Sequence, residues 1–247
     1  KGSTCALLEA ILTRAGFRVG CYTSPHLLRY NERVRIDAEA AADLDLCNAF
    51  AAVQAARGTT SLTYFEFGTL AALWLFCRAG LDVAILEVGL GGRLDAVNAF
   101  DSDCAILTNV DLDHMDYLGA DVESIGREKA GVFRKGRPAI FADTAMPRSV
   151  QRAAADIEAQ LLPLEQAFGY QQHTQTNQWD YWGPGGKRYA LPLPALRGTY
   201  QLRNASACLA ALDTLRELLP VAQQHVKRGL AEVSLPGRFQ VLPGQPV

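Results

Sequence analysis

The sequence of 247 residues lacks the features that mark several classes of protein. It has no excess of positive charge, since 24 lysines and arginines stand against 26 aspartates and glutamates. Nucleic-acid-binding surfaces are basic, so this balance predicts no nucleic-acid partner. There is also no run of about eighteen apolar residues, no signal-peptide pattern and no polybasic tract. We therefore predict no membrane span and no membrane-surface partner.

The cysteines also lack a metal-binding or redox spacing, because none of the six forms a CxxC pair. They lie among apolar neighbours, as buried free thiols do, which predicts a reducing compartment, the cytoplasm. No internal repeat and no low-complexity segment is present. The hydrophobic fraction of 49% is enough for a sizeable core, and we expect a monomer.

Strands alternate with helices from Val19 to Phe141, which predicts a mostly parallel α/β sheet flanked by helices. The segment WDYWGPGGKRYALPLP, within residues 161–197, predicts a small β-hairpin insertion. The chain starts at Lys1 rather than Met, and a Pro-Gly-Arg turn precedes its last residues. We expect a piece of a longer protein, with a central domain at 1–236 and a hinge into a further domain at 237–247.

The segment LDVAILEVGLGGRLDAVN, residues 81–98, is the most informative one. Val83 to Leu86 is short, apolar and β-branched, which favours a buried strand of a parallel sheet. Glu87 then lies at the carboxyl end of that strand, where open α/β sheets bind ligands. A carboxylate there, beside a glycine-rich turn, either holds a metal ion or caps a tight turn. The residues alone leave both interpretations open.

Two other strand or helix ends have candidate ligand-binding groups. Lys1-Gly2-Ser3-Thr4 precedes an amphipathic helix and is either the tail of a phosphate-binding loop or an ordinary helix start capped by Ser3. Ser24 follows the strand predicted at Val19–Tyr22, and Pro25 keeps it out of helical geometry. Its hydroxyl either faces a ligand or belongs to a plain turn.

Three further patterns have equally open interpretations. Thr63-Tyr64-Phe65-Glu66 begins a helix, and its aromatic rings either stack on a flat ligand or pack in the core. His114 lies among three aspartates, in a metal site or a solvated acidic loop. Lys129 lies on a short helix, where a lysine is usually a solvated charge.

Taken together, the motifs resemble the Mur ligase superfamily, most closely its folylpolyglutamate synthase and dihydrofolate synthase branch. The matching segments occur in the family's order: KGST at 1–4, YTSPHLLRYNERVRI at 22–36, SLTYFEFGTLAALWLF at 61–76, LDVAILEVGLGGRLDAVN at 81–98, LDHMDYLG at 112–119, SIGREKAGVFR at 124–134, YQLRNASACLAAL at 200–212 and LPGRFQVL at 235–242. They cover nearly the whole chain except the 145–195 region.

The resemblance implies a P-loop NTPase-like central ligase domain that couples ATP hydrolysis to amide formation with L-glutamate. The substrates would be dihydropteroate and reduced folates, which places the enzyme in folate biosynthesis and one-carbon metabolism. A substrate carboxylate would attack the γ-phosphate, and the glutamate amine would then displace phosphate from the acyl phosphate. Two Mg²⁺ sites are expected.

The resemblance also implies roles for individual residues. It assigns ATP binding to Lys1, Gly2, Ser3, Asn204 and Arg238; metal binding to Ser24, Glu87 and His114; carbamylation to Lys129; and pteroate binding to Thr63, Tyr64, Phe65, Glu66, Leu94, Asp95 and Ala96. We further expect the two pteroate-binding segments to form facing walls of one cleft. In that cleft the aromatic rings would stack on the pterin, and Glu66 or Asp95 would accept its ring N–H groups.

The sequence also departs from the family's pattern. The glycine-containing GTNG segment before Lys1 and the carboxyl-terminal domain are not in the sequence, so we expect residues 1–247 alone to be inactive. Tyr200 replaces the family's usual histidine. Two alternatives remain: a Mur-type ligase acting on a UDP-muramoyl peptide, and an ATP-binding module without catalytic activity.

Overall fold

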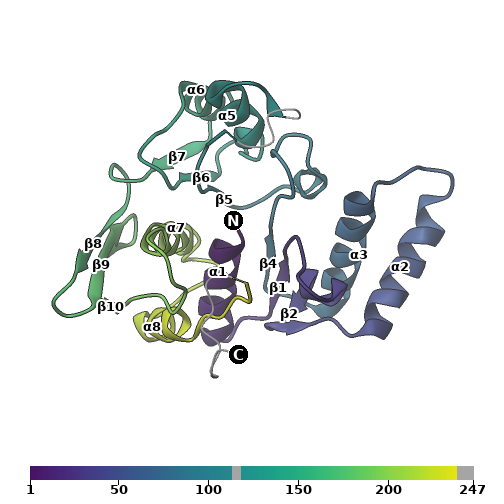
Figure 1. The fold of residues 1–247 in the computed structure, drawn as a ribbon, viewed down its shortest axis with the longest axis horizontal. Coiled ribbons are helices and arrows are strands. Elements are labelled where there is room, and N and C mark those ends of the chain that lie inside the picture. Colours follow the sequence, from purple (N-terminus) through teal and green to yellow (C-terminus); the bar gives the residue numbers. More distant parts are fainter. Residues whose placement is uncertain (113–117, 238–247) are drawn as a thin grey trace, which may run out of the picture.

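The structure is a computed structural model that describes residues 1–112 and 118–237. Helices and strands alternate through most of this part (Figure 1). The helices are α1 (Gly2–Arg14), η1 (Tyr30–Arg33), α2 (Asp43–Arg57), α3 (Tyr64–Ala79), η2 (Ala96–Ala99), α5 (Val122–Ala130), α6 (Arg148–Asp156), α7 (Gln201–Thr214) and α8 (Gln223–Glu232). The strands are β1 (Val19–Tyr22), β2 (Val34–Ile36), β3 (Glu39–Ala40), β4 (Val83–Leu86), β5 (Ala105–Leu107), β6 (Pro138–Phe141), β7 (Gln160–Pro163), β8 (Gly169–His173), β9 (Gln178–Gly183) and β10 (Gly186–Pro192).

The first sheet has the strand order β3-β2-β1-β4. Strand β1 pairs in parallel with the edge strand β4, whereas β2 and β3 continue the sheet on its other side in antiparallel order. Helix α1 packs on β1 and β4, and α3 packs against β1 and β2 with α2 beside it. On the other side, α1 contacts α7 and α8, so α1 is enclosed by the sheet and these two helices.

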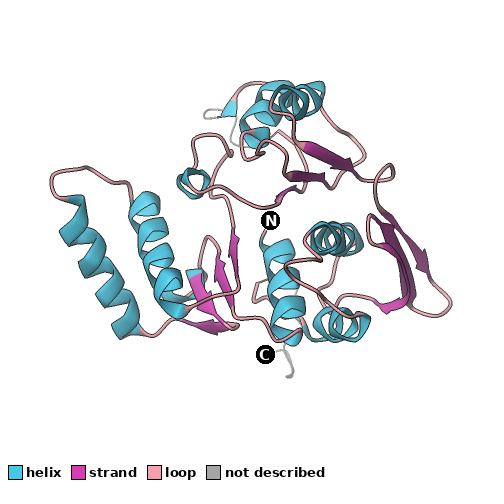
Figure 2. Cartoon of the chain, turned by 180° about the vertical axis from the view of Figure 1, so that it is seen from behind, coloured by secondary structure: helices cyan, strands magenta, loops and turns pink. Residues whose placement is uncertain are grey.

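The second sheet, β5-β6-β7, is parallel throughout. Helix α7 packs against β5 and β6, while residues of α5 and α6, such as Ala130 and Val150, share a core cluster with Ala105 and Phe141 of the sheet. The amino-terminal end of α1 points toward this second sheet, and the N-terminus lies near the centre of the molecule (Figure 1, Figure 2). The start of α1 therefore lies where the two sheets approach each other.

The predicted hairpin insertion is present, with its turn between β9 and β10, but β8 extends it to a three-stranded antiparallel sheet. This sheet lies at the periphery of the molecule (Figure 2). Trp179 and Tyr181 are fully buried against the α7 and α8 core. Both residues therefore attach the insertion to the rest of the protein.

The predicted α/β class is confirmed, and three details differ from the expectation. The strands are divided between two sheets rather than forming one. Strand β4 lies at the edge of the first sheet, so Ala84 is exposed and the predicted full burial of this strand is wrong. All six cysteines are free, as expected, but Cys47 and Cys77 are exposed on α2 and α3. Among the described residues, no helix combines the length and hydrophobicity needed to cross a membrane.

Candidate functional site

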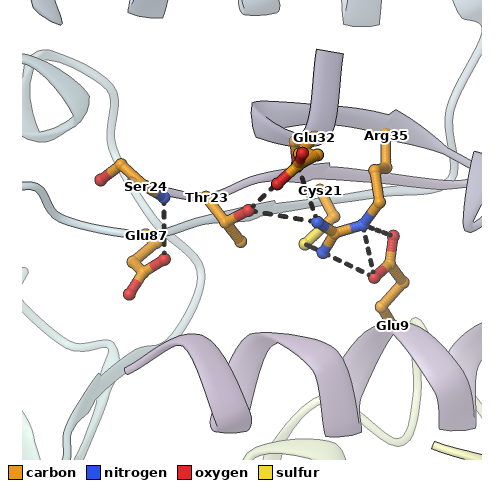
Figure 3. Close-up of polar contacts among 7 residues, drawn as sticks. All are labelled: Glu9, Cys21, Thr23, Ser24, Glu32, Arg35 and Glu87. Carbon is orange, nitrogen blue, oxygen red and sulfur yellow. Dashed lines mark hydrogen bonds and ion pairs between the residues drawn. The ribbon is translucent and has the colours of Figure 1, made fainter. Parts of the chain in front are cut away.

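Glu87 is a buried carboxylate directly after β4, and it faces two other candidate residues. Its Oε2 accepts a hydrogen bond of 3.1 Å from the backbone N–H of Ser24 (Figure 3). Its Oε1 lies 3.8 Å from the position that a β-carbon on Gly2 would occupy. Burial and, to a smaller extent, the Glu87 carboxylate raise the pKa of the nearby Cys5 to about 12, so this thiol stays protonated. Glu87 thus connects the end of β1 with the start of α1.

Helix α1 begins at Gly2, within the segment for which the resemblance implies phosphate binding. Lys1 occupies the N-cap position, and Ser3 lies buried within the first turn. The alternative in which Ser3 caps the helix is therefore wrong. The Lys1 ammonium donates hydrogen bonds to the carbonyls of Val88 (2.8 Å) and Gly89 (3.0 Å). Helix α1 is thereby connected to the glycine-rich turn that follows Glu87.

A polar cavity of about 670 Å³ opens beside the start of α1. Lys1 and Ser3 line it together with Asn204 of α7, so three of the predicted ATP-binding residues share one space. The Asn204 amide donates to Gln201 Oε1 at 3.1 Å. The amino-terminal ends of two helices, α1 and α7, meet at this cavity, and such ends favour anions.

Several other residues that line the cavity were not predicted to bind ATP. They are Thr108, Asn109, Val110, Asp111, Asp143, Arg197, Gly198, Tyr200, Gln201, Arg203 and Gly237. Asn109 and Asp143 lie just after β5 and β6, so the preference of ligands for the carboxyl ends of parallel strands could have identified them. Arg197 and Arg203 have no such signal. Arg203 pairs with Asp143 at 2.8 Å and lies over the ring of Tyr200.

Lys129 lies on α5, which packs on the turn that follows Glu87. Its ammonium donates to the carbonyl of Asn109, a residue of the cavity wall, at 3.4 Å. A β-carbon on Gly92 would lie 2.7 Å from the Lys129 carbonyl oxygen, so only glycine allows this close approach. Lys129 thus lies behind the wall of the cavity that Lys1 and Asn204 line, in contact with Asn109.

The aromatic start of α3 lies on the opposite side of the turn after β4. A capping box fixes this helix start, since Thr63 Oγ1 accepts from the Glu66 N–H at 3.2 Å and Glu66 accepts from the Thr63 N–H at 2.6 Å. The Phe65 ring lies 2.8 Å from the position of a β-carbon on Gly89. Helix η2, which begins at Ala96, packs against α3. The two segments predicted to bind pteroate are therefore neighbours.

That Glu66 or Asp95 accepts the pterin N–H groups stays a prediction, and the structure shows that neither carboxylate is buried or unpaired. Glu66 is exposed and takes part in the capping box, whose backbone hydrogen bond from Thr63 lowers its pKa. Asp95 accepts hydrogen bonds from the backbone N–H groups of Leu90 (2.9 Å) and Val97 (3.0 Å). Leu94 and Tyr64 are largely exposed. On this side the Tyr64 ring and Glu66 are therefore exposed, and the Phe65 ring is partly buried.

His114 and Arg238, together with Asp113 and Asp116, lie outside the described residues. Within residues 1–112 and 118–237, no three histidine, cysteine or acidic side chains come together as a metal site. The described residues nevertheless fit a magnesium ion that is partly bound by water and phosphate. Glu87 provides a buried carboxylate and Ser24 a hydroxyl, both of them oxygen ligands, and Mg²⁺ usually keeps several waters.

Comparisons with known proteins agree with this geometry. Residues 1–212 match the Mur ligase middle domain family. The whole chain is 46% identical to the dihydrofolate synthase/folylpolyglutamate synthase of Escherichia coli K12 and spans 56% of that protein. A solved structure of E. coli FolC in complex with DHPP and ADP has a TM-score of 0.91, at 46% identity over 98% of this chain and 56% of that one.

A second structure is a bifunctional folylpolyglutamate synthase/dihydrofolate synthase with Mn, AMPPNP and L-glutamate bound. It has a TM-score of 0.91 and 51% identity over 99% of this chain and 58% of that one. The chain thus spans a little over half the length of the relatives it matches. The resemblance predicted from the sequence motifs is confirmed.

Proposed function

Because the chain belongs to the Mur ligase family through its middle domain, we propose that the protein is an ATP-dependent ligase of the folate branch. It adds L-glutamate to dihydropteroate, which gives dihydrofolate, and to tetrahydrofolate, which gives folylpolyglutamates. The relatives at 46% and 51% identity that are described as dihydrofolate and folylpolyglutamate synthases support this substrate class. The six free cysteines support a cytoplasmic location.

One observation carries the proposal: the candidate residues form a continuous series of contacts. Ser24 hydrogen-bonds Glu87, Glu87 faces Gly2 at the start of α1, and Lys1 lines the cavity shared with Asn204. Phosphoryl transfer needs positioning and charge neutralisation more than covalent chemistry from the protein. This arrangement supports binding of a nucleotide whose terminal phosphate lies beside Glu87.

The residues of this chain would act as follows. The N–H groups at the start of α1 and the Lys1 ammonium hold phosphate oxygens, and Asn204 and Arg238 contact the nucleotide. Ser24, Glu87 and His114 would hold Mg²⁺, with a carbamate on Lys129 serving a second ion. The bound metal would neutralise charge that develops on the phosphate oxygens. Two ions match the family, and the manganese-bound relative supports a divalent cation.

The reaction proceeds in two steps. An oxygen of the pteroate carboxylate bonds to the γ-phosphorus of ATP, and the bond to the departing ADP breaks. The glutamate amine then attacks the acyl carbon, and inorganic phosphate leaves with the bonding electrons while the amine loses a proton to the surroundings. We assign the pteroate to Thr63–Glu66 and Leu94–Ala96, with the rings of Tyr64 and Phe65 as stacking surfaces.

The test is phosphate release by the full-length protein with MgATP, L-glutamate and one acceptor at a time. We expect release, with a matching amide product, for dihydropteroate and tetrahydrofolate. A UDP-muramoyl peptide should give none. Release with that peptide alone would assign the protein to the other branch of the family. No release with any acceptor, despite nucleotide binding, would indicate an ATP-binding module without catalytic activity.

A further inference from the structure

A buried ion pair joins β2 to α1, and β2 is the strand next to β1, which leads to Ser24. Arg35 of β2 and Glu9 of α1 are 17% and 7% exposed at their side chains, and their closest atoms are 2.8 Å apart. Arg35 Nε and Nη2 both donate to the Glu9 carboxylate, in the fork geometry that only arginine provides (Figure 3). The pair therefore joins β2 firmly to the helix that begins at Lys1.

The other donors of Arg35 reach the segment that carries Ser24. Nη1 donates to Thr23 Oγ1 at 3.2 Å and to the Glu32 carbonyl at 3.0 Å, and Nη2 approaches Cys21 Sγ at 3.3 Å. All five N–H groups of the guanidinium thus have partners. A side chain that only neutralised Glu9 would not need these contacts, which fix the end of β1 directly before Ser24.

Glu32 extends the same network to the loop after Ser24. Its carboxylate accepts backbone hydrogen bonds from Leu27 (2.7 Å), Leu28 (2.9 Å) and Arg29 (2.7 Å). Its carbonyl accepts from Arg35 and from the Thr23 hydroxyl. The loop is therefore held on both sides of Ser24, by Arg35 at Thr23 and by Glu32 at residues 27–29.

We propose that Arg35 is a positioning residue for the metal–phosphate site, because it sets how the start of α1 lies relative to Ser24. Glu87 lies between these two parts, with Ser24 on one carboxylate oxygen and Gly2 near the other. A shift of α1 against the end of β1 would change the separation between phosphate and metal ligands. This inference rests on the proposed function.

Arg35→Lys is the informative variant, because lysine keeps a positive charge beside Glu9 but cannot also reach Thr23 and Glu32. In the full-length protein we expect kcat to fall and the affinity for Mn²⁺ in the presence of ADP to fall, each by roughly tenfold to a hundredfold. The KM for dihydropteroate should stay near the wild-type value, because Arg35 donates to Glu9, Thr23 and Glu32, none of which is assigned to the pteroate. Mn²⁺ binding is measured by titration calorimetry.

Arg188→Lys is the matched control. Arg188 of β10, in the insertion at the edge of the molecule, pairs with Asp213 of α7 at 3.1 Å, with side chains 20% and 3% exposed. It is about as buried a pair as Glu9–Arg35, although Arg188 donates through Nη2 alone whereas Arg35 donates through Nε and Nη2. We expect Arg188→Lys to lower the melting temperature about as much as Arg35→Lys does, with unchanged kcat and Mn²⁺ affinity.

If Arg35→Lys fails to fold, Thr23→Val tests the positioning role of Arg35 instead. Valine keeps the shape of threonine and removes only the hydroxyl that accepts from Arg35. We expect the same losses in kcat and Mn²⁺ affinity, reduced to roughly threefold to tenfold. The inference would be overturned if Thr23→Val kept the wild-type kcat and Mn²⁺ affinity. It would also be overturned if Arg35→Lys and Arg188→Lys had equal kcat and equal Mn²⁺ affinity.

The binding measurement separates this inference from the proposed function. Mn²⁺ affinity in the presence of ADP does not depend on which carboxylate the enzyme ligates. If the wild-type protein ligates no folate substrate, the proposed function fails, while the calorimetric comparison of Arg35→Lys with Arg188→Lys still supports or overturns the role of Arg35.

Discussion

The two sides of the turn after β4 differ in what they leave for a ligand. On one side, Lys1, Ser3 and Asn204 line a polar cavity of about 670 Å³. On the other, the Phe65 ring lies against Gly89, while Glu66 and Asp95 accept hydrogen bonds from the backbone. Lys1 and Asn204 also have hydrogen-bond partners within the chain, so the two sides differ in their surfaces: the first borders a polar cavity, and the second carries aromatic rings.

This difference indicates two modes of recognition at one site. A helix N-terminus and a lysine suit an anion such as a phosphate, whose hydrogen bonds and charge they match. Aromatic rings on a rigidly capped helix suit a flat apolar ring, which needs surface and shape more than charge. We therefore expect mutations on the two sides to have separable effects on the nucleotide and on the pteroate.

The largest effect should come from Glu87→Gln in the full-length protein. The amide keeps the size of the side chain but removes the charge that would hold the metal, which should raise the barrier by about 3 kcal/mol or more. Turnover should fall below detection while the melting temperature stays near the wild-type value. Glu123→Gln on α5 is the control and should remain active. Near-normal turnover of Glu87→Gln at saturating Mg²⁺ would exclude Glu87 as a metal ligand.

Phe65→Ala tests the other side. Loss of the ring should raise the KM for dihydropteroate by roughly tenfold to a hundredfold, the value of burying a phenylalanine side chain, and leave the KM for ATP unchanged. Phe67→Ala is the control, since Phe67 lies on the same helix but packs on Phe50 with ring centroids 5.8 Å apart. A raised KM for ATP with an unchanged KM for dihydropteroate would show that the pteroate site is misplaced.

Local sequence signals were sufficient for the elements on both sides of this turn. Thr63 and Glu66 have the spacing of a capping box, and Gly80 ends α3 with positive φ, so the bounds of the helix follow from its sequence. Glu87 could be placed because an apolar β-branched run ends directly before it. Assigning it a role required the resemblance, because a strand-end carboxylate alone fits a turn equally well.

Other features had no local signal. The β2–β3 hairpin turns at Asp37 and Ala38, which both have positive φ, and alanine gives no indication of such a turn. The Asp37 side chain stabilises it by accepting from the Val19 N–H at 2.9 Å. Glu9 and Arg35 are 26 residues apart in the sequence, so their pairing depends on how α1 packs on the sheet. Tertiary packing, rather than the local preferences of the residues, therefore determines both the β2–β3 turn and the Glu9–Arg35 pair.

Glu66→Ala should sharpen the comparison with a smaller effect. If the carboxylate serves the capping box, its loss should lower the melting temperature and change the KM for dihydropteroate by less than about threefold. Thr63→Ala removes the other half of the box and should behave in the same way. A rise in KM as large as that of Phe65→Ala would show that Glu66 recognises the ligand directly.

The smallest effect concerns the acid stability of the loop after Ser24. Backbone hydrogen bonds from Leu27, Arg29 and Leu28 lower the pKa of Glu32 from its ordinary value of 4.5 to about 2. Because the unfolded chain binds this proton first, the stabilisation is complete above pH 4.5 and is lost as the pH falls toward 2. Glu32→Gln lacks the charge, so its melting temperature should be lower than that of the wild type at pH 7. The difference should shrink across this pH window in melts recorded at successive pH values. A difference that stays constant with pH would show that the carboxylate charge does not hold the loop after Ser24.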